Sequence, residues 1–224
     1  MTAALPAPRT AGLLRVREFS RTEDGERLHA LLWSAGPGWR MISSAVLGGG
    51  IGERAWVLNA QVAHGYARTD PARHLAALAG TAGATGGGVG LMTAADVRAY
   101  GRAEDGGSEA VVTAGLGVRG WAASPAPGRE LPAAPGTVNT LVAVPAALSD
   151  AALVNAVATA TEAKVQALLD AGYDCSGTPT DAVCVAARVP GPGEAPHAFA
   201  GPRSVWGARL ARAVYAATRA AAAA

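Results

Sequence analysis

The sequence predicts an α+β fold, in which a mixed β-sheet is covered by a few helices within one domain over residues 13–223. Short apolar runs separated by turn residues dominate the first half of the chain and are typical of strands. Long alanine-rich segments with helical start and stop signals follow in the second half. Half of the 224 residues are hydrophobic and only 16% are charged, so the chain can bury a sizeable core.

The apolar runs predict strands, which in chain order span residues 13–19, 27–33, 41–47, 54–62, 89–93, 111–116, 138–144 and 183–187. Turn residues at 22–25 and at 36–38 predict that the first three of these strands form two antiparallel hairpins. Pro145 has no amide proton and should end the pairing of the strand before it.

Three helices are predicted from their end signals. Pro71 fits the first position of a helix over residues 71–79, with Asp70 as its N-cap and Gly80 at its end. Ser149 and Gly172 bound a longer helix over residues 150–171. An alanine-rich helix over residues 205–223 could pack closely against a partner, so a homo-oligomer is one expectation. Residues 1–12 are expected to be a disordered tail, and residues 122–136 and 190–202 to be loops.

Composition excludes several classes of function. A net charge of +2 gives no basic field for nucleic acid, and no apolar run is long enough to span a bilayer. Cys175 and Cys184 fit neither a disulfide framework nor a CxxC metal pair, and the four histidines lack ligand spacing. The glycines of residues 115–120 lead into a proline-rich loop rather than a helix, which argues against a dinucleotide site. We therefore expect a cytoplasmic protein without membrane or nucleic-acid partners, metal or cofactor.

Lys164, the only lysine of the chain, is the clearest chemical signal. At about 100° per residue it falls on the apolar stripe of the helix over residues 150–171, together with Leu153 and Leu168. The polar residues expected on the opposite, hydrated side are Asn155, Thr159, Glu162 and Gln166. A lysine on a core-facing stripe destabilises the fold unless its amine is paired or lies at a cleft.

Three interpretations of Lys164 compete at this point. The amine could extend past the helix edge into water, or form a structural ion pair. It could also lie in an active site, where desolvation favours the neutral amine that acts as a general base. Thr178, Thr180 and Asp181 directly precede a predicted strand, as expected of a ligand-binding loop held by rigid elements. Asp181 could pair with Lys164, or the segment could be an ordinary turn that Asp181 caps.

Further polar residues stand beside predicted core strands, and each is a candidate for binding a substrate or for a purely structural hydrogen bond. They are Ser43, Ser44, Asn59, Thr93, Asp96, Asn139 and Thr140. Asp96 could equally cap a turn.

Several segments together carry a family resemblance. They are residues 43–52, 57–59 with Val62, 70–71, 88–97, 136–140, 159–164 and 177–182, and His197 with residues 199–202. On these residues the chain resembles the adenosylcobinamide amidohydrolases over about residues 30–220. One departure is Cys175-Ser176, where the family usually has Ala-Thr before Gly-Thr.

The resemblance implies an amide hydrolase of corrinoid salvage. Its members cleave the amide between a propionyl arm of the corrin ring and aminopropanol, and release adenosylcobyric acid. Amide hydrolysis needs an activated nucleophile and a stabilised oxyanion. We expect Lys164 to be the base that acts on Thr178, Thr180 or a water, with Asp181 orienting the amine or the water.

The remaining roles are expectations of the same kind. Asn59 and Asn139 would donate hydrogen bonds to the oxyanion or to corrin amides, and His197 would protonate the leaving amine. The other residues expected to bind substrate are Ser43, Ser44, Thr93, Asp96, Thr140 and Glu162. The corrinoid is then the small-molecule substrate and not a cofactor. Two alternatives stay open, namely a homologous enzyme with another small substrate and a corrinoid-binding protein without activity.

Overall fold

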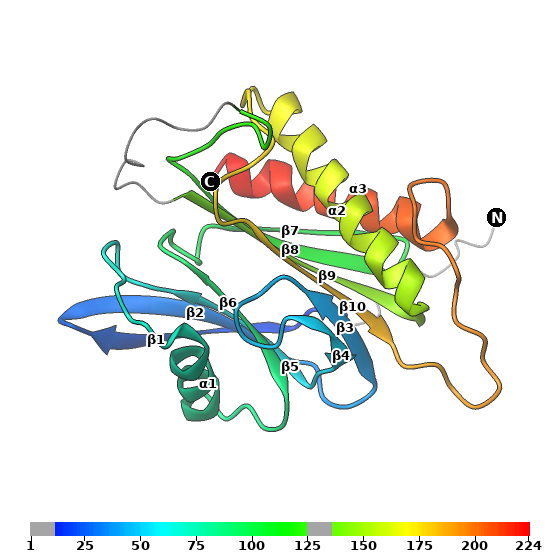
Figure 1. Ribbon diagram of the computed structural model, residues 1–224, viewed down its shortest axis with the longest axis horizontal. Coiled ribbons are helices and arrows are strands. Elements are labelled where there is room, and N and C mark those ends of the chain that lie inside the picture. Colours follow the sequence, from blue (N-terminus) through cyan, green and yellow to red (C-terminus); the bar gives the residue numbers. More distant parts are fainter. Residues whose placement is uncertain (1–11, 125–135) are drawn as a thin grey trace, which may run out of the picture.

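The computed structural model describes residues 12–124 and 136–224. Over these residues the chain forms ten strands and three helices, which confirms the predicted α+β class. Figure 1 shows them in four layers: helices α2 (Asp150–Asp170) and α3 (Val205–Ala222), a six-stranded sheet, a four-stranded sheet, and helix α1 (Pro71–Thr81). The strands are therefore divided between two mixed sheets rather than gathered in one.

The four-stranded sheet has the order β1-β2-β5-β6, built from β1 (Val16–Glu23), β2 (Glu26–Ser34), β5 (Trp56–Gln61) and β6 (Gly88–Thr93). The six-stranded sheet has the order β4-β3-β10-β9-β8-β7, built from β4 (Gly50–Glu53), β3 (Trp39–Ser43), β10 (Ala182–Arg188), β9 (Gly136–Ala147), β8 (Ser108–Leu116) and β7 (Tyr100–Asp105). The pairs β5–β6 and β9–β10 are parallel, and the other pairs are antiparallel.

The first predicted hairpin is confirmed, whereas the second is wrong. β1 and β2 pair up to Glu23 and Glu26, and Asp24 and Gly25 form the turn with positive φ angles of 48° and 83°. β2 then pairs with β5, while β3 joins the other sheet and pairs with β4 and β10. The turn residues at 36–38 therefore carry the chain from one sheet to the other, where β3 pairs with the nearby β4 and with β10 near the other end of the chain.

Two strands, β4 and β7, were not predicted, and β9 does not end where the sequence suggests. The edge strand β7 was not predicted, because its polar side chains are exposed on one face and no apolar run marks it. Pro145 does not end β9, which continues to Ala147. The pairing of β9 with β10 instead shifts register after Val144, so the proline lies at an irregularity where no ladder hydrogen bond is required of it.

The long helix has the predicted ends. The Ser149 hydroxyl accepts a hydrogen bond from the Ala152 amide at 3.1 Å, and Gly172 has a φ of 88° just beyond the last turn. α1 begins at Pro71 as predicted, but the Asp70 side chain makes no capping bond and instead accepts from Arg68 at 2.9 Å. The helix also continues past Gly80 to Thr81.

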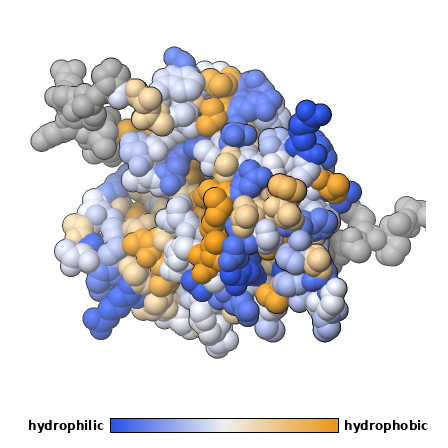
Figure 2. Space-filling model, turned by 45° about the vertical axis from the view of Figure 1, so that its right-hand side comes forward, coloured by the Kyte–Doolittle hydropathy of each residue, from blue (hydrophilic) through white to orange (hydrophobic). Residues whose placement is uncertain are grey.

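Three apolar cores hold the four layers together. One lies between α2, α3 and the six-stranded sheet, one between the two sheets, and one between the four-stranded sheet and α1. Leu153 and Leu168 of α2 are fully buried in accordance with the predicted stripe, and each such side chain stabilises the fold by about 1.5–3 kcal/mol. On the face shown in Figure 2, hydrophobic side chains lie in patches among hydrophilic ones.

The alanine-rich face of α3 packs inside the chain. Ala213, Ala217 and Ala221 are buried, and a Cβ at Gly101 of β7 would collide with the Ala217 carbonyl oxygen. This face is therefore used against the sheet and not offered to a partner. None of the three helices is long and apolar enough to cross a membrane. Most of the predicted tail at 1–12 and of the loop at 122–136 lies outside the described residues.

Candidate functional site

Two cavities lie on either side of the end at which β10 begins. The helix-side cavity, of about 260 Å³, is lined by Ser44, Val138, Thr140, Val157, Ala160, Thr161, Lys164, Asp181, Ala182 and Val183. The sheet-side cavity, of about 370 Å³, is lined by Ser44, Ala45, Val46, Val62, Gly90, Leu91, Met92, Thr93, Ala94, Thr137, Thr180, Asp181 and Ala182. Ser44, Asp181 and Ala182 line both, and we call these three residues the shared wall.

Lys164 and Asp181 form an ion pair in the helix-side cavity. Nζ of Lys164 lies 2.5 Å from Oδ2 of Asp181, and the two side chains are only 10% and 19% exposed. The ion-pair interpretation of the lysine is therefore confirmed, and extension into water is wrong because the amine is turned inward. The pair also lines a cavity, which places it where it can meet a ligand.

The Asp181 carboxylate is held from several sides. Its Oδ1 accepts hydrogen bonds from the Val138 amide at 2.8 Å and from the Thr178 amide at 3.2 Å, and the Thr178 hydroxyl donates to the same oxygen. Oδ2 is left for the lysine. The first residues of β9 and the turn before β10 thus fix the carboxylate, and the Thr178 hydroxyl proton is directed at Asp181 rather than at a cavity.

Gly177 covers this ion pair with its backbone. Its φ is 153°, and a Cβ at this position would collide with Asp181 Oδ2 and Lys164 Nζ. The glycine is held by two backbone hydrogen bonds at 3.0 Å, from the Gly120 amide to the Gly177 carbonyl and from the Ser176 amide to the Gly120 carbonyl. Sequence reasoning did not single out Gly177, although a glycine beside two threonines and an acid was the available signal.

Thr180 and Thr137 form a hydroxyl pair at the sheet-side cavity. Their Oγ1 atoms lie 2.5 Å apart, and the Thr180 hydroxyl donates to the Gly136 carbonyl at 2.9 Å. The proton between the two threonines is therefore supplied by Thr137. Thr137 lines the cavity but was not among the predicted site residues.

Three of the predicted substrate-binding residues do line the cavities. The Ser44 hydroxyl accepts from the Val183 amide at 3.1 Å, which leaves its own proton free to be donated at the shared wall. Thr93 accepts from the Ala95 amide at 3.0 Å and lines the sheet-side cavity. Thr140 is buried and lines the helix-side cavity.

Ser43 and Asp96 have structural partners instead. The Ser43 hydroxyl donates to the Val183 carbonyl at 2.8 Å and accepts from the Ala45 amide at 3.0 Å, which fixes the end of β3. Asp96 accepts from the Arg98 amide at 3.0 Å and caps a turn, as the alternative prediction had it. The hydrogen bonds of the Arg98 side chain lower the pKa of this carboxyl. Neither residue lines a cavity of the candidate site.

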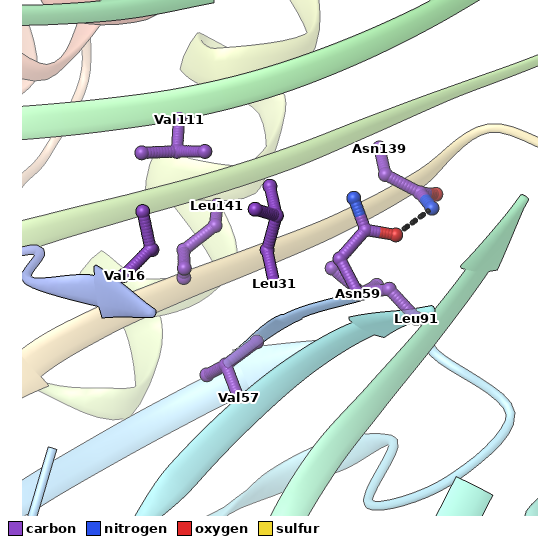
Figure 3. A pocket seen from close by; sticks show the side chains of 8 residues that line it. All are labelled: Val16, Leu31, Val57, Asn59, Leu91, Val111, Asn139 and Leu141. Carbon is purple, nitrogen blue, oxygen red and sulfur yellow. Dashed lines mark hydrogen bonds between the residues drawn. The ribbon is translucent and has the colours of Figure 1, made fainter. Parts of the chain in front are cut away.

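Asn59 and Asn139 lie between the two sheets and line neither cavity, although Met92, whose carbonyl accepts from Asn139, lines the sheet-side cavity. Figure 3 shows the Asn139 amide donating to Asn59 Oδ1, at 2.8 Å, beside a void of only about 10 Å³. Asn59 donates in turn to the Thr113 hydroxyl at 2.9 Å, and Asn139 also donates to the Met92 carbonyl at 3.0 Å. These amides join β5, β6, β8 and β9, and their expected contact with an oxyanion stays a prediction.

His197 and Glu162 are not brought to the site. The His197 carbonyl accepts from the Ser149 amide at the start of α2, about 22 Å along the helix axis from Lys164 at 1.5 Å per residue. Its imidazole Nε2 accepts from Trp206 at 3.0 Å. Glu162 is exposed and lines a different pocket. Thr159, expected in water, is buried and donates to the Ala200 carbonyl at 2.9 Å.

Both cysteines are buried and unbridged. Burial raises the pKa of the Cys184 thiol to about 12. Cys175 and Ser176 line neither cavity, and the Ser176 hydroxyl accepts from the Ala122 amide at 2.8 Å. The residues that depart from the family pattern therefore support the loop behind Gly177. Within residues 12–124 and 136–224, no cluster of three or more His, Cys, Asp or Glu side chains could hold a metal ion.

Comparison with known proteins identifies the family. The family model described as adenosylcobinamide amidohydrolase matches residues 14–224, which include every residue of both cavities. The chain is also 35% identical over 143 residues to an adenosylcobinamide amidohydrolase of Methanosarcina mazei, an alignment that covers 64% of this chain and 67% of that protein. The chain belongs to the adenosylcobinamide amidohydrolase family.

Proposed function

We propose that the protein hydrolyses adenosylcobinamide to adenosylcobyric acid in corrinoid salvage, at the shared wall of the two cavities. One observation carries this assignment of the site: an ion pair of the buried Lys164 with the partly buried Asp181 lines a cavity in a chain of this amidohydrolase family. Buried ionisable pairs in cavities are typical of catalytic sites.

The reaction adds one water across the amide. The water oxygen forms a bond to the carbonyl carbon, and the carbonyl π electrons move to oxygen, which gives a tetrahedral oxyanion. The carbon–nitrogen bond then breaks, and its electron pair leaves with the nitrogen. One proton passes from the water to this nitrogen, so the products are adenosylcobyric acid and 1-amino-2-propanol.

Lys164 supplies the charge that this sequence of steps requires. Nζ lies 2.5 Å from Oδ2 of Asp181, and an ammonium group there has two further protons beside the one directed at Asp181. We assign Lys164 first to stabilising the oxyanion and then to protonating the leaving nitrogen, after which the neutral amine takes up the proton that the added water loses. The base role expected from the sequence would require Nζ to pass a proton to Asp181 before it accepts one from the water.

Asp181 and Ser44 complete the assignment. Asp181 orients the amine, because three donors fix its other oxygen. Ser44, which belongs to the shared wall, donates its free hydroxyl proton to the carbonyl oxygen. Since the hydroxyl protons of Thr178 and Thr180 are directed at Asp181 and the Gly136 carbonyl, we propose that the nucleophile is a water.

The setting is part of the proposal. We propose a cytoplasmic enzyme whose small-molecule partner is the corrinoid and which needs no cofactor of its own. A homo-oligomer stays a prediction, which sedimentation of the full chain tests.

Incubation of the purified protein with adenosylcobinamide separates the three functions. Conversion to adenosylcobyric acid with release of 1-amino-2-propanol, followed by mass spectrometry, is the expected result. A change in the corrinoid spectrum without conversion would indicate a binding protein. Neither change would favour a homologous enzyme with another substrate and would contradict the proposal.

A further inference from the structure

The two cavities differ in a way that orients the substrate. Resting on the proposed function, we infer that the helix-side cavity receives the amino-alcohol end of the scissile amide and the sheet-side cavity receives the corrin side. Val157 then determines which amino alcohols are accepted.

The position of Lys164 supports this orientation. The lysine lines the helix-side cavity but not the sheet-side cavity, whereas Asp181 and Ser44 line both. The leaving nitrogen must receive a proton, and Lys164 is the cationic donor of the helix-side cavity. The amide therefore lies at the shared wall with its nitrogen turned toward α2.

The lining of the helix-side cavity fits a small amphipathic group. Val138, Val157, Ala160 and Val183 form its apolar part, and the Thr140 hydroxyl is a polar group within it. 1-Amino-2-propanol has five non-hydrogen atoms, including one methyl and one hydroxyl group, and fits within about 260 Å³. Its methyl group would pack against Val157 and Ala160, and its hydroxyl group would face Thr140.

The sheet-side cavity fits the larger part of the substrate. Its volume of about 370 Å³ holds only an edge of a substituted corrin ring, so most of the ring must remain at the surface. Val46 lines this cavity with a side chain that is 52% exposed, although it is a large hydrophobic residue. An apolar side chain held at the rim offers a contact surface for the macrocycle.

The experiment compares two corrinoids that differ by one methyl group, one carrying 1-amino-2-propanol and the other 2-aminoethanol. The ratio of their kcat/KM values is measured for wild type, Val157→Phe and Val157→Ala. Val46→Phe, at the rim of the other cavity, is the matched control. A methyl group in an apolar pocket changes kcat/KM by about tenfold or more, so the ratio is sensitive to its surroundings.

We expect Val157→Phe to shift the ratio at least about tenfold toward the smaller amino alcohol, since the added ring occupies the space of the methyl group. Val157→Ala should weaken the preference of the wild type between the two corrinoids. If Val157→Phe does not fold, this smaller substitution still tests the role of Val157. Val46→Phe should lower both kcat/KM values and leave their ratio unchanged.

If the ratio of the two kcat/KM values changes in Val46→Phe and stays constant in both Val157 variants, the inferred orientation is wrong, whereas the proposed function still holds. Wild-type protein that hydrolyses neither corrinoid would instead refute the proposed function. The two failures are thus distinguishable in one set of assays.

Discussion

Nζ of Lys164 and Oδ2 of Asp181 lie 2.5 Å apart, although the lysine projects from the middle of α2 and the aspartate from the loop that enters β10. Both side chains are largely withdrawn from water. A buried pair is stabilised only when its remaining hydrogen-bonding groups are satisfied, and the bonds to Asp181 Oδ1 meet that need on the acid side. This relationship underlies the first two predictions.

Removing one member of the pair should destabilise the protein more than removing both. Asp181→Asn leaves a buried ammonium group without its counter-ion, and we expect the free energy of unfolding to fall by roughly 3 kcal/mol. Lys164→Met combined with Asp181→Asn should recover part of that loss, because no unpaired charge is left. Urea denaturation of the two single variants and the double variant measures the coupling, and strictly additive losses would contradict it.

Gly177→Ala should impair catalysis as well as stability. The added methyl group meets Lys164 Nζ and Asp181 Oδ2, so we expect kcat to fall by about tenfold or more when these groups are displaced. Gly193→Ala is the matched control, because Gly193 has a positive φ of 77° and nothing within 4 Å of an added Cβ. Both variants should lose about 1 kcal/mol or more of stability to backbone strain, but only Gly177→Ala should lose activity. Equal kcat values for the two would argue against this placement of the ion pair.

Asn59→Leu should reduce stability and leave turnover intact. The substitution removes the acceptor of the Asn139 amide and the donor to Thr113, both of which are buried between the sheets. We expect a loss of about 1–3 kcal/mol in unfolding free energy. Steady-state assays well below the melting temperature should give a kcat close to that of wild type. A large fall in kcat with unchanged folding would restore the substrate-binding role that the sequence suggested.

Stability at acid pH should depend on Glu23. Burial raises the pKa of this carboxyl, but hydrogen bonds from Arg21 and His74 outweigh it and hold the pKa below its ordinary value of 4.5. A carboxyl with a lowered pKa in the folded state stabilises the protein fully above its ordinary pKa. This contribution is lost as the pH falls through the lower folded-state value.

The melting temperature of Glu23→Gln should therefore fall less than that of the wild type when the pH is lowered from 6 to well below 4.5. The variant keeps an oxygen for the Arg21 guanidinium, which lies 2.8 Å from Glu23 Oε1 in the wild type. Thermal unfolding followed across this pH range provides the comparison. If the melting temperatures of wild type and variant fall in parallel as the pH is lowered, Glu23 contributes nothing to the loss of stability at acid pH.

Capping and turn residues correctly predicted those elements whose ends depend on neighbouring residues in the sequence. Ser149 and Gly172 bound α2 as expected, and residues 22–25 turn β1 into β2. β3 was misplaced because its partners are β4 and β10, and no short-range pattern specifies a pairing with a strand near the other end of the chain.

The site was predictable only where sequence pattern and burial coincide. Lys164 stood out because a charge on an apolar stripe needs a partner, and Asp181 was named as that partner. His197, Glu162, Asn59 and Asn139 were grouped with it on polarity or resemblance, which do not measure distance. Thr137 and Gly177 were missed because their importance arises from contacts across β9, β10 and α2.

The most direct test of the account is the turnover of adenosylcobinamide by Lys164→Met and Lys164→Arg, with His197→Ala as a folded control. We expect Lys164→Met to lose about 100-fold or more in kcat, as on removal of one oxyanion donor, while His197→Ala stays near wild type. Lys164→Arg keeps the positive charge but can neither accept a proton from the water nor give one to the leaving nitrogen, so measurable turnover in it supports oxyanion stabilisation by charge, whereas none shows that the amine must exchange a proton. Lys164→Met turning over near the wild-type rate would contradict the central claim that this amine takes part in the chemistry.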